Sequence, residues 1–240
     1  MKTEKIVLNS ERKVFLTTYI QETDDIETRA ALLILPGGGY HICAPREGES
    51  VALAFMKYGF NAFVLNYSVD NRETMPGNQA WPNPLEDYEQ AMEYLISNTT
   101  SLKVDPARIA LVGFSAGGHL ASAAVVSADH RPAACILGYP VTGFDERYGE
   151  GMYDATANVD ERTCPCFIFA AADDPVVDVM NSIKFVEALA EKGVPFECHF
   201  YSHGPHAFSV CDPTFNLADH CPRISDWVDD SAHWLDEILG

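Results

Sequence analysis

The chain alternates between two kinds of hydrophobic pattern. Short runs rich in β-branched and aromatic residues predict strands, and longer segments with apolar residues at helical spacing predict helices. The predicted strands are Lys5–Leu8, Lys13–Tyr19, Ala30–Leu35, Asn61–Tyr67, Arg108–Gly113, Ala133–Tyr139, Cys166–Ala171 and Phe196–Tyr201. The predicted helices, which begin only after the third strand, are Glu47–Tyr58, Pro84–Ser97, Ala116–Ser127, Val179–Glu191 and Ser225–Leu239.

This alternation predicts an α/β fold. Strands that are apolar along their whole length are typical of a parallel sheet, so we expect a mostly parallel, eight-stranded sheet with helices on both faces. The turn Asn9–Arg12 has no room for a helix, so the first two strands predict an antiparallel hairpin at the edge of the sheet. Because no repeat, low-complexity tract or Gly/Ser linker divides the sequence, we expect residues 1–240 to form a single domain.

Charge and composition narrow the classes of partner. The chain has 35 acidic and 16 basic residues, a formal net charge of −19, and this field repels both phosphate backbones and anionic lipids. We therefore expect neither nucleic acid nor a membrane as partner, and the segment Met1–Asp25 has no pattern of a signal peptide or anchor. The 7 cysteines are scattered and several lie in apolar runs, which indicates reduced thiols and predicts a cytoplasmic location.

One serine lies in a pattern that predicts a nucleophile. The motif Gly113-Phe114-Ser115-Ala116-Gly117 follows a predicted strand and opens a predicted helix. In such a sharp turn the serine is held in a strained conformation, and its hydroxyl projects at the helix N-terminus, where negative charge is favoured. A glycine-rich helix cap is the structural alternative, but the strand before the motif and the helix after it favour the nucleophile.

A run of three glycines follows the third predicted strand. It lies in the segment Pro36-Gly37-Gly38-Gly39-Tyr40, and because glycines cost backbone entropy, some function must need bare N–H groups there. When a nucleophilic serine lies in a strand-to-helix turn, this loop and the residue after the serine supply N–H donors for an oxyanion. A phosphate loop is the alternative, but no Gly-Lys-Ser/Thr follows and the acidic chain disfavours phosphate.

An acid and a base are expected after the last two strands, in the chain order Ser, Asp or Glu, His. Asp173, Asp174 and Asp178 all follow the strand Cys166–Ala171, and any of the three fits the role of the acid. Two histidines follow the next strand and either fits the role of the base. These are His203 and His206.

A zinc site is the competing interpretation of the last predicted strand. Its ligands would be Cys198, His199, His203 and His206. Cys198 and His199 are adjacent in a strand and so point to opposite faces, and no His-Glu-x-x-His motif appears. We therefore expect no metal.

These motifs resemble those of the α/β-hydrolases, and more narrowly those of the acetylxylan-esterase-like carbohydrate esterases and their neighbours in the hormone-sensitive-lipase-like group. The resemblance covers nearly the whole chain and is most specific at the segment Gly113–His119. The other segments that carry it are Leu35–Tyr40, Arg46–Glu47, Phe63–Val69, Pro82–Asp87, Ala172–Val177 and Gly204–Phe208.

The resemblance implies roles for single residues. The acid of the family's D-x-x-V pattern falls on Asp174, and the base of its G-G-H-G-F pattern falls on His206, although Pro205 and Ala207 replace the flanking glycines. The implied reaction is acyl transfer without metal or cofactor, in which Ser115 attacks an ester carbonyl, His206 takes its proton and Asp174 fixes the imidazole tautomer. The N–H groups that would bind the oxyanion are those of Gly38, Gly39 and Ala116.

The substrate class follows from the resemblance and from the short, glycine-containing segment Pro140–Thr163, which leaves little material for a lipid-binding lid. We expect a serine esterase that removes a short acyl group, most simply acetyl, from a neutral carbohydrate or similar alcohol, with an acetylated sugar or oligosaccharide as substrate. The aromatic residues that could floor a sugar site, although a core position is commoner, are Tyr40, Tyr67, Trp81 and Phe208.

Two alternatives stay open beside the esterase. An amidase or peptidase of the prolyl-oligopeptidase type would share the triad, but that family usually carries a large extra domain. A hydrolase-fold binding protein without catalysis is the other alternative, and the intact triad and glycine loop argue against it.

Overall fold

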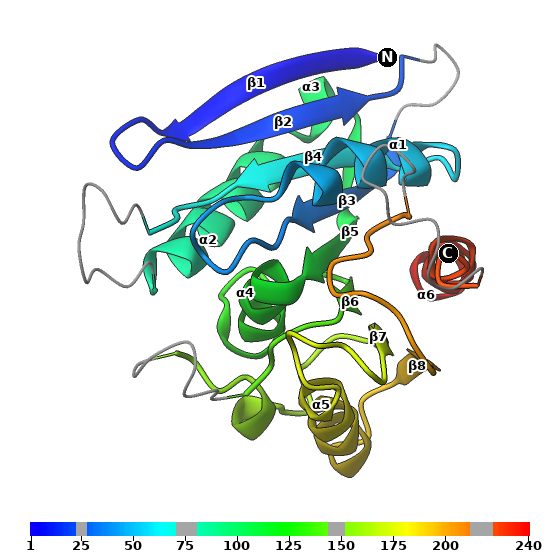
Figure 1. Cartoon of the computed structure of the whole chain (residues 1–240). Helices are drawn as coiled ribbons and strands as arrows, with labels where there is room; N and C mark the ends of the chain where they lie inside the picture. Colours follow the sequence, from blue (N-terminus) through cyan, green and yellow to red (C-terminus); the bar gives the residue numbers. More distant parts are fainter. Residues whose placement is uncertain (23–27, 71–80, 144–151, 212–222) are drawn as a thin grey trace.

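A single mixed sheet organises the molecule. The computed structural model describes residues 1–22, 28–70, 81–143, 152–211 and 223–240, and within these residues eight strands form one sheet in the order β1-β2-β4-β3-β5-β6-β7-β8 (Figure 1). The strands are β1 (Lys2–Asn9), β2 (Val14–Ile20), β3 (Arg29–Leu35), β4 (Asn61–Asn66), β5 (Val104–Phe114), β6 (Ala134–Gly138), β7 (Cys166–Ala171) and β8 (Phe196–Tyr201). The helices are α1 (Glu49–Met56), α2 (Asn83–Ser97), α3 (Thr99–Leu102), α4 (Ser115–Ser127), α5 (Met180–Glu191) and α6 (Trp227–Leu239), with 3-10 turns at Pro45–Glu47 and Thr156–Asn158.

The predicted sheet architecture is confirmed. The strands from β3 to β8 pair in parallel, and β2 pairs antiparallel with both β1 and β4. The N-terminal hairpin therefore forms one edge of the sheet, at the top of Figure 1, and β8 forms the other. Because the parallel strands share one direction, the turns after β3, β5, β7 and β8 meet at the same edge of the sheet.

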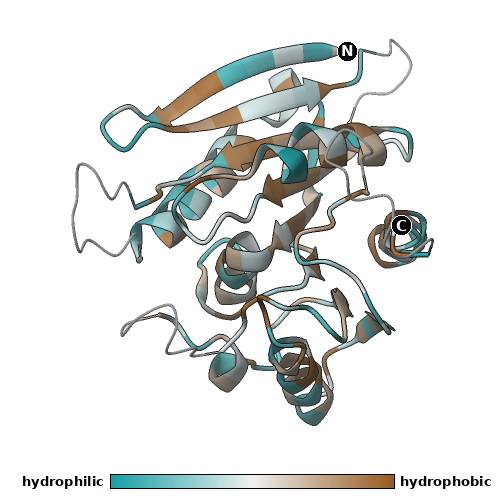
Figure 2. Ribbon diagram, in the orientation of Figure 1, coloured by the Kyte–Doolittle hydropathy of each residue, from teal (hydrophilic) through white to brown (hydrophobic). Residues whose placement is uncertain are grey.

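Helices cover both faces of the sheet, and each face has its own core. Alternate residues of one strand serve both: Leu33 and Leu35 of β3 pack towards α2, α4 and α5, whereas Leu32 and Ile34 pack towards α1 and α6. This is the two-residue period of a strand buried on both sides. Figure 2 shows the hydrophobic residues gathered along the central strands.

Some element boundaries differ from the sequence prediction. The helix predicted at Glu47–Tyr58 is divided at Gly48, whose φ of −108° and ψ of −97° are not helical, into the 3-10 turn and α1. Strand β5 begins at Val104, earlier than predicted, because the polar residues before the apolar run give no strand signal. Helix α3 has four residues, too few to show a hydrophobic period, and the last helix begins at Trp227.

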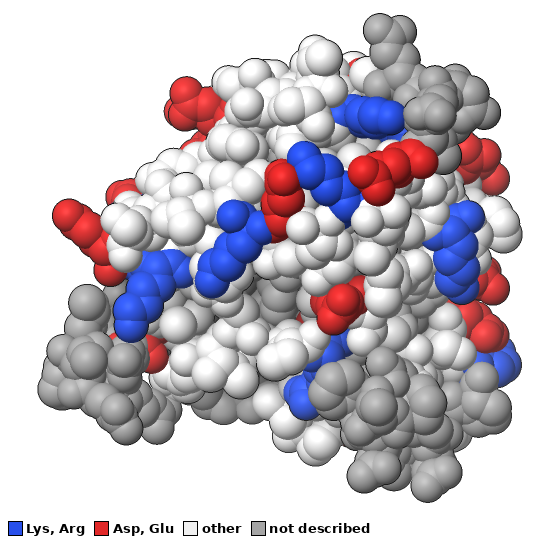
Figure 3. All heavy atoms as spheres, turned by 90° about the horizontal axis from the view of Figure 1, so that it is seen from above, with Lys and Arg blue, Asp and Glu red and all other residues white. Residues whose placement is uncertain are grey.

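The surface over the N-terminal hairpin mixes both signs of charge. Figure 3 shows Lys and Arg side chains lying among Asp and Glu on this face, and Lys2 pairs with Glu4 at 3.0 Å. None of the helices formed by the described residues combines the length and hydropathy that crossing a bilayer requires. Six cysteines are free thiols, and Cys221 lies outside the described residues.

Candidate active site

Ser115 sits at the turn between β5 and α4, as its motif predicts. Its φ is +52°, a left-handed value that few non-glycine residues adopt, while Phe114 before it is extended. The turn needs glycine on both sides: a Cβ on Gly113 would lie 2.3 Å from the carbonyl oxygen of Gly117, and a Cβ on Gly117 would lie 2.1 Å from that of Leu35. The motif glycines therefore let the helix and strand approach closely enough to force the serine outward.

Ser115, His206 and Asp174 form a hydrogen-bonded chain. The Oγ of Ser115 lies 2.9 Å from Nε2 of His206, and Nδ1 of His206 lies 2.7 Å from Oδ2 of Asp174. An ionised carboxylate can only accept a hydrogen bond, so Nδ1 carries the proton and Nε2 accepts from the serine hydroxyl. The side chain of Asp174 is 1% exposed and that of His206 is 14% exposed, so the imidazole is more accessible to solvent than the carboxylate that orients it.

The surroundings of Asp174 favour its charged form. Burial on its own would raise the pKa of Asp174, but the hydrogen bond to His206 and its charge, together with the N–H groups of Val176 and Val177, lower it. These N–H groups donate to Oδ1 at 2.8 and 3.0 Å, so both carboxylate oxygens are occupied. The acid is thus held ionised and in one orientation.

The other candidate acids and the second histidine have different partners. Asp173 accepts the N–H of Gly204 at 2.8 Å, and Asp178 accepts the N–H of Met180 at 2.9 Å, where α5 begins. His203 is exposed, and its Nδ1 contacts the hydroxyl of Ser202. Of the two histidines, His206 is the one that reaches Ser115.

The residues of the competing zinc interpretation do not converge. His199 stacks on Phe167 and pairs with Glu197 at 2.7 Å, while His206 is bound to the serine and Asp174. In the part of the chain that the structure describes, no group of three or more His, Cys, Asp or Glu residues is placed to hold a metal ion.

The glycine loop lies directly beside the serine. Gly38, Gly39 and Tyr40 have φ values of +129°, +63° and +59°, and a Cβ on Gly37 would lie 2.9 Å from the Cβ of Ser115. Hydrogen bonds from His41 and Ala44 back to the carbonyls of Gly38 and Gly37 close the loop. The N–H groups of Gly38, Gly39 and Ala116 donate to no acceptor among the described residues, so they are available to a ligand.

A buried acid that the sequence analysis gave no role supports this loop. Glu47 is 1% exposed, and its Oε2 accepts the N–H of Gly37 at 2.7 Å while its Oε1 accepts the hydroxyl of Tyr139 at 2.7 Å. Burial raises the pKa of Glu47, and these two hydrogen bonds act in the opposite direction. Two sequence signals point to it: its place between the glycine loop and an apolar helix, and the segment Arg46–Glu47, which carries part of the family resemblance.

Three of the four aromatic candidates for a sugar site lie in the core. Tyr67 is 1% and Phe208 is 0% exposed, so neither offers a surface to a sugar, and the Tyr67 hydroxyl donates to the carbonyl of Pro36 beneath the glycine loop. Tyr40 is 7% exposed and donates its hydroxyl to His119. Trp81 is half-buried and is the candidate that retains an outward surface. Residues that close the turns at strand ends are buried by those turns, which the pattern of the strands does not reveal.

His119 joins these aromatic residues from within α4. Its Nε2 donates to the carbonyl of Tyr153 at 2.8 Å, so Nδ1 must accept the hydroxyl of Tyr40 at 2.7 Å. The rings of Trp81 and Tyr40 meet its ring edge-on at 5.1 and 5.8 Å. Burial lowers the pKa of His119 to about 4, so the ring is neutral at pH 7.

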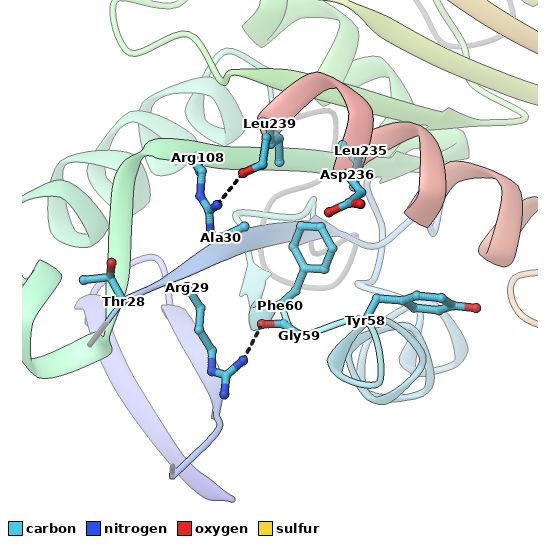
Figure 4. A pocket seen from close by; sticks show the side chains of 11 residues that line it. Thr28, Arg29, Ala30, Tyr58, Gly59, Phe60, Arg108, Leu235, Asp236 and Leu239 are labelled. Carbon is cyan, nitrogen blue, oxygen red and sulfur yellow. Dashed lines mark hydrogen bonds between the residues drawn. The ribbon is translucent and has the colours of Figure 1, made fainter. Parts of the chain in front are cut away.

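A cleft of about 230 Å³ lies at the opposite end of the strands, between α6 and the starts of β3 and β4 (Figure 4). Two guanidinium groups face it, but both are bound to backbone carbonyls: Arg29 donates to Gly59 at 3.2 Å and Arg108 to Gly240 at 2.8 Å. Ligand sites of parallel sheets lie at the carboxyl ends of the strands. We therefore assign these arginines to the structure rather than to the chemistry.

The sequence matches the model of a known protein family. A family model described as BD-FAE matches residues 16–147, more than half of the 240 residues. The chain belongs to the BD-FAE family. The match includes the glycine loop and Ser115, whereas Asp174 and His206 lie beyond it. The resemblance to carbohydrate esterases of the α/β-hydrolase fold is thereby confirmed.

Two relatives of this BD-FAE family member are much longer proteins. An endo-1,4-β-xylanase B of Butyrivibrio fibrisolvens is 33% identical over 224 residues, which cover 80% of this chain and 34% of that protein. An acetylxylan esterase of Xylanibacter ruminicola is 29% identical over 232 residues, which cover 87% of this chain and 45% of that protein. The chain thus spans less than half the length of these relatives.

Solved structures match the BD-FAE chain along its whole length. An α/β-hydrolase, MGS-M1, from a Medee basin deep-sea metagenome library has a TM-score of 0.90 at 36% identity and covers 100% of this chain and 98% of its own. An acetyl ester-xyloside bifunctional hydrolase from Caldicellulosiruptor lactoaceticus has a TM-score of 0.84 at 29% identity and covers 98% and 96%. The fold is therefore that of the α/β-hydrolases.

Proposed function

We propose that the chain is a serine esterase that hydrolyses short-chain esters, most simply acetyl esters of a carbohydrate or similar neutral alcohol. The observation that carries the proposal is the series of hydrogen bonds from Ser115 through His206 to Asp174, beside a loop in which the N–H groups of Gly38 and Gly39 have no acceptor among the described residues. A nucleophile, a base, an orienting acid and oxyanion donors are the parts that acyl transfer needs. In this role the triad is catalytic.

The reaction follows from the positions of the protons. Ser115 Oγ attacks the ester carbonyl as its proton moves to Nε2 of His206, and the carboxylate of Asp174 stabilises the imidazolium that forms. The carbonyl oxygen becomes an oxyanion and is bound by the N–H groups of Gly38, Gly39 and Ala116. His206 then gives its proton to the leaving alcohol oxygen. A water molecule then gives a proton to His206 as it attacks the acyl-enzyme, and His206 returns that proton to Ser115 Oγ as the acid is released.

The proposed substrate class has two supports. The relatives include an acetylxylan esterase and an acetyl ester-xyloside hydrolase, both named for acetyl esters. The net charge of −19 disfavours anionic substrates but does not affect a neutral sugar. Trp81, half-buried and next to Tyr153 at a ring distance of 6.0 Å, is the aromatic surface that we propose for the alcohol.

The test is a hydrolysis screen of acetylated sugars and oligosaccharides beside aryl acetates, with Ser115→Ala as the decisive variant. We expect the parent to release acetate and Ser115→Ala to lose at least about 10³-fold in kcat, because a triad member has been removed. Ser122→Ala is the matched control, since Ser122 is a buried serine of the same helix that donates only to the carbonyl of His119. A folded Ser115→Ala enzyme with a tenth of the parent activity would contradict the proposal.

A further inference from the structure

We infer that Glu47 is a positioning residue that fixes two loops relative to each other: the glycine loop, residues 36–40, here called the oxyanion loop, and the loop after β8 that carries His206, residues 202–209, here called the base loop. This inference rests on the proposed esterase function and adds a residue to it. Glu47 does not touch the triad. It acts through Gly37 on one side and through Tyr139 on the other.

The link to the oxyanion loop is direct and tight. The N–H of Gly37 donates to Oε2 of Glu47 at 2.7 Å, and Gly37 is the residue that precedes Gly38. A Cβ on Gly37 would meet the carbonyl oxygen of Phe114, Oε2 of Glu47 and the Cβ of Ser115, all at 2.7 to 2.9 Å. The backbone of Gly37 is therefore confined between the carboxylate and the serine, so that the carboxylate sets how far the loop stands from Ser115.

The link to the base loop passes through Tyr139 at the end of β6. The Tyr139 hydroxyl donates to Oε1 of Glu47 and accepts the N–H of Ser209 at 3.1 Å, three residues after His206. The Tyr139 ring also meets the His206 ring edge-on at 5.1 Å. Ala207 and Ser209 have φ values of +60° and +49°, so this loop holds a conformation that needs support from outside.

A second contact ties the same two segments together. The hydroxyl of Ser209 donates to the carbonyl of Arg46 at 2.6 Å, beside Glu47 in the 3-10 turn. On the far side, Nε1 of Trp227 donates to the carbonyl of Ser209 at 2.8 Å. The base loop is thus fixed to the turn that carries the carboxylate and to α6.

A carboxylate suits this place better than an amide. Both neighbours, the N–H of Gly37 and the O–H of Tyr139, are donors, and a carboxylate offers an acceptor to each. Glutamine has the same shape but only one acceptor, so in Glu47→Gln either the N–H of Gly37 faces an NH2 group and loses its partner, or the Tyr139 hydroxyl can no longer donate to residue 47 and must turn its O–H elsewhere. This variant therefore loosens one loop without creating a cavity.

A control must separate positioning from plain stability. Asp87 is buried like Glu47, and its Oδ2 likewise accepts a backbone N–H, that of Ser68 at 2.7 Å, but its side-chain partner is Arg12 and no residue of the site. Asp87→Asn is thus a matched loss of a buried carboxylate whose hydrogen bonds go to Arg12 and Ser68 and not to the glycine loop, Tyr139 or the triad. Tyr139→Phe is the second probe, because it keeps the ring against His206 and removes only the hydroxyl link.

The experiment measures kcat and KM for an aryl acetate per titrated active site, the melting temperature, and the Kd of phenylboronic acid, which adds to Ser115 as a tetrahedral mimic. In Glu47→Gln we expect kcat to fall about 10- to 100-fold, less than for deletion of a whole oxyanion donor, with KM within about threefold and the boronate Kd raised in parallel. Asp87→Asn should lose melting temperature and keep kcat. Glu47→Gln combined with Tyr139→Phe should be scarcely worse than the poorer single variant, because both break one network.

The outcomes separate the two proposals. If Glu47→Gln keeps kcat and boronate affinity within twofold, or if Asp87→Asn loses as much kcat, Glu47 is not a positioning residue. If Glu47→Gln does not fold, Tyr139→Phe decides by the same criteria. A parent enzyme without esterase activity, or an active Ser115→Ala variant, overturns the proposed function itself.

Discussion

At the scale of single residues, Ser115 is positioned by a strained backbone, whereas His206 and Asp174 are positioned by hydrogen bonds. The left-handed φ of Ser115 costs of the order of 1–3 kcal/mol, and the packed glycines of its turn hold it in place. His206 and Asp174 are instead placed by hydrogen bonds, which reach the acid from Val176 and Val177. Ser115, His206 and Asp174 can therefore each be tested by a side-chain substitution that does not alter the backbone.

The first prediction concerns the two histidines after β8. His206→Ala should reduce kcat by about 10³-fold or more, because it removes the group that accepts the serine proton. His203→Ala should stay close to the parent, since His203 is exposed and contacts only Ser202 among the described residues. Steady-state hydrolysis of an aryl acetate by both variants is the measurement. An inactive His203→Ala variant beside an active His206→Ala variant would reverse the assignment of the base.

The second prediction concerns the three acids after β7. Asp174→Asn should lower kcat by a factor on the order of 10⁴, because the amide favours the wrong imidazole tautomer. Asp173→Asn and Asp178→Asn should stay within about tenfold, since an amide oxygen still accepts from the N–H groups of Gly204 and Met180. Circular dichroism checks that all three variants fold. If Asp173→Asn or Asp178→Asn is instead the variant that loses activity, Asp174 is not the orienting acid.

At the scale of elements, α4 links the nucleophile to a buried neutral histidine. Twelve of its residues are buried, and His119 occupies the same face as Ser115, one turn later. His119 joins Tyr40 of the glycine loop to Tyr153 of the segment after β6. The helix thus joins these two segments through a histidine that is neutral at pH 7.

This gives the third prediction, on stability against pH. Unfolded histidine titrates near 6.5, whereas the pKa of His119 in the folded state is about 4, so the unfolded chain binds more protons between these values. The free energy of unfolding should therefore fall by up to about 3 kcal/mol as pH drops from 7 to 4. His119→Gln, which carries no titrating group, should show a shallower fall in urea titrations across this range. Equal slopes for parent and variant would contradict the prediction.

How far the sequence could anticipate the structure depends on the distance between interacting residues. The strands, the turn at Ser115 and every helix except the four-residue α3 follow from local patterns, so they were predictable to within a few residues. The acid was not, because Asp173 and Asp174 differ by one position of register, and the resemblance to a family was needed to select one. Glu47 and Tyr139 are 92 positions apart, and no local pattern records such a contact. Tyr67 and Phe208 are buried by turns that fold over strand ends, which strand periodicity does not describe.

At the scale of the whole molecule, we propose that the connections between strands limit the size of the acyl group. The connection from β6 to β7 contains a 3-10 turn at Thr156–Asn158, and its residues 144–151 lie outside the described part. The whole chain matches 98% of its structural neighbour MGS-M1. A long acyl chain would need an additional apolar surface to leave water.

The fourth prediction is a preference for short acyl groups. Because each methylene contributes about 1–3 kcal/mol to discrimination in a fitted pocket, acetyl should exceed octanoyl by at least about tenfold in kcat/KM. A series of aryl esters from acetyl to octanoyl, assayed below the micelle-forming concentration, measures this. Equal or faster turnover of the octanoyl ester would indicate a lipase-like site instead.

The order of the strands has a consequence for the nascent chain. Ser115 and His206 are 91 positions apart, and the base loop follows β8, the strand at the far edge of the sheet. A ribosome that has released the chain as far as α4 has delivered the nucleophile and its glycine loop but neither acid nor base. Trp227 of α6 then holds the base loop through Ser209. During synthesis the proposed activity can therefore arise only after β8 and the segment that carries His206 have joined the sheet, and not from the early folding of the half that carries the serine.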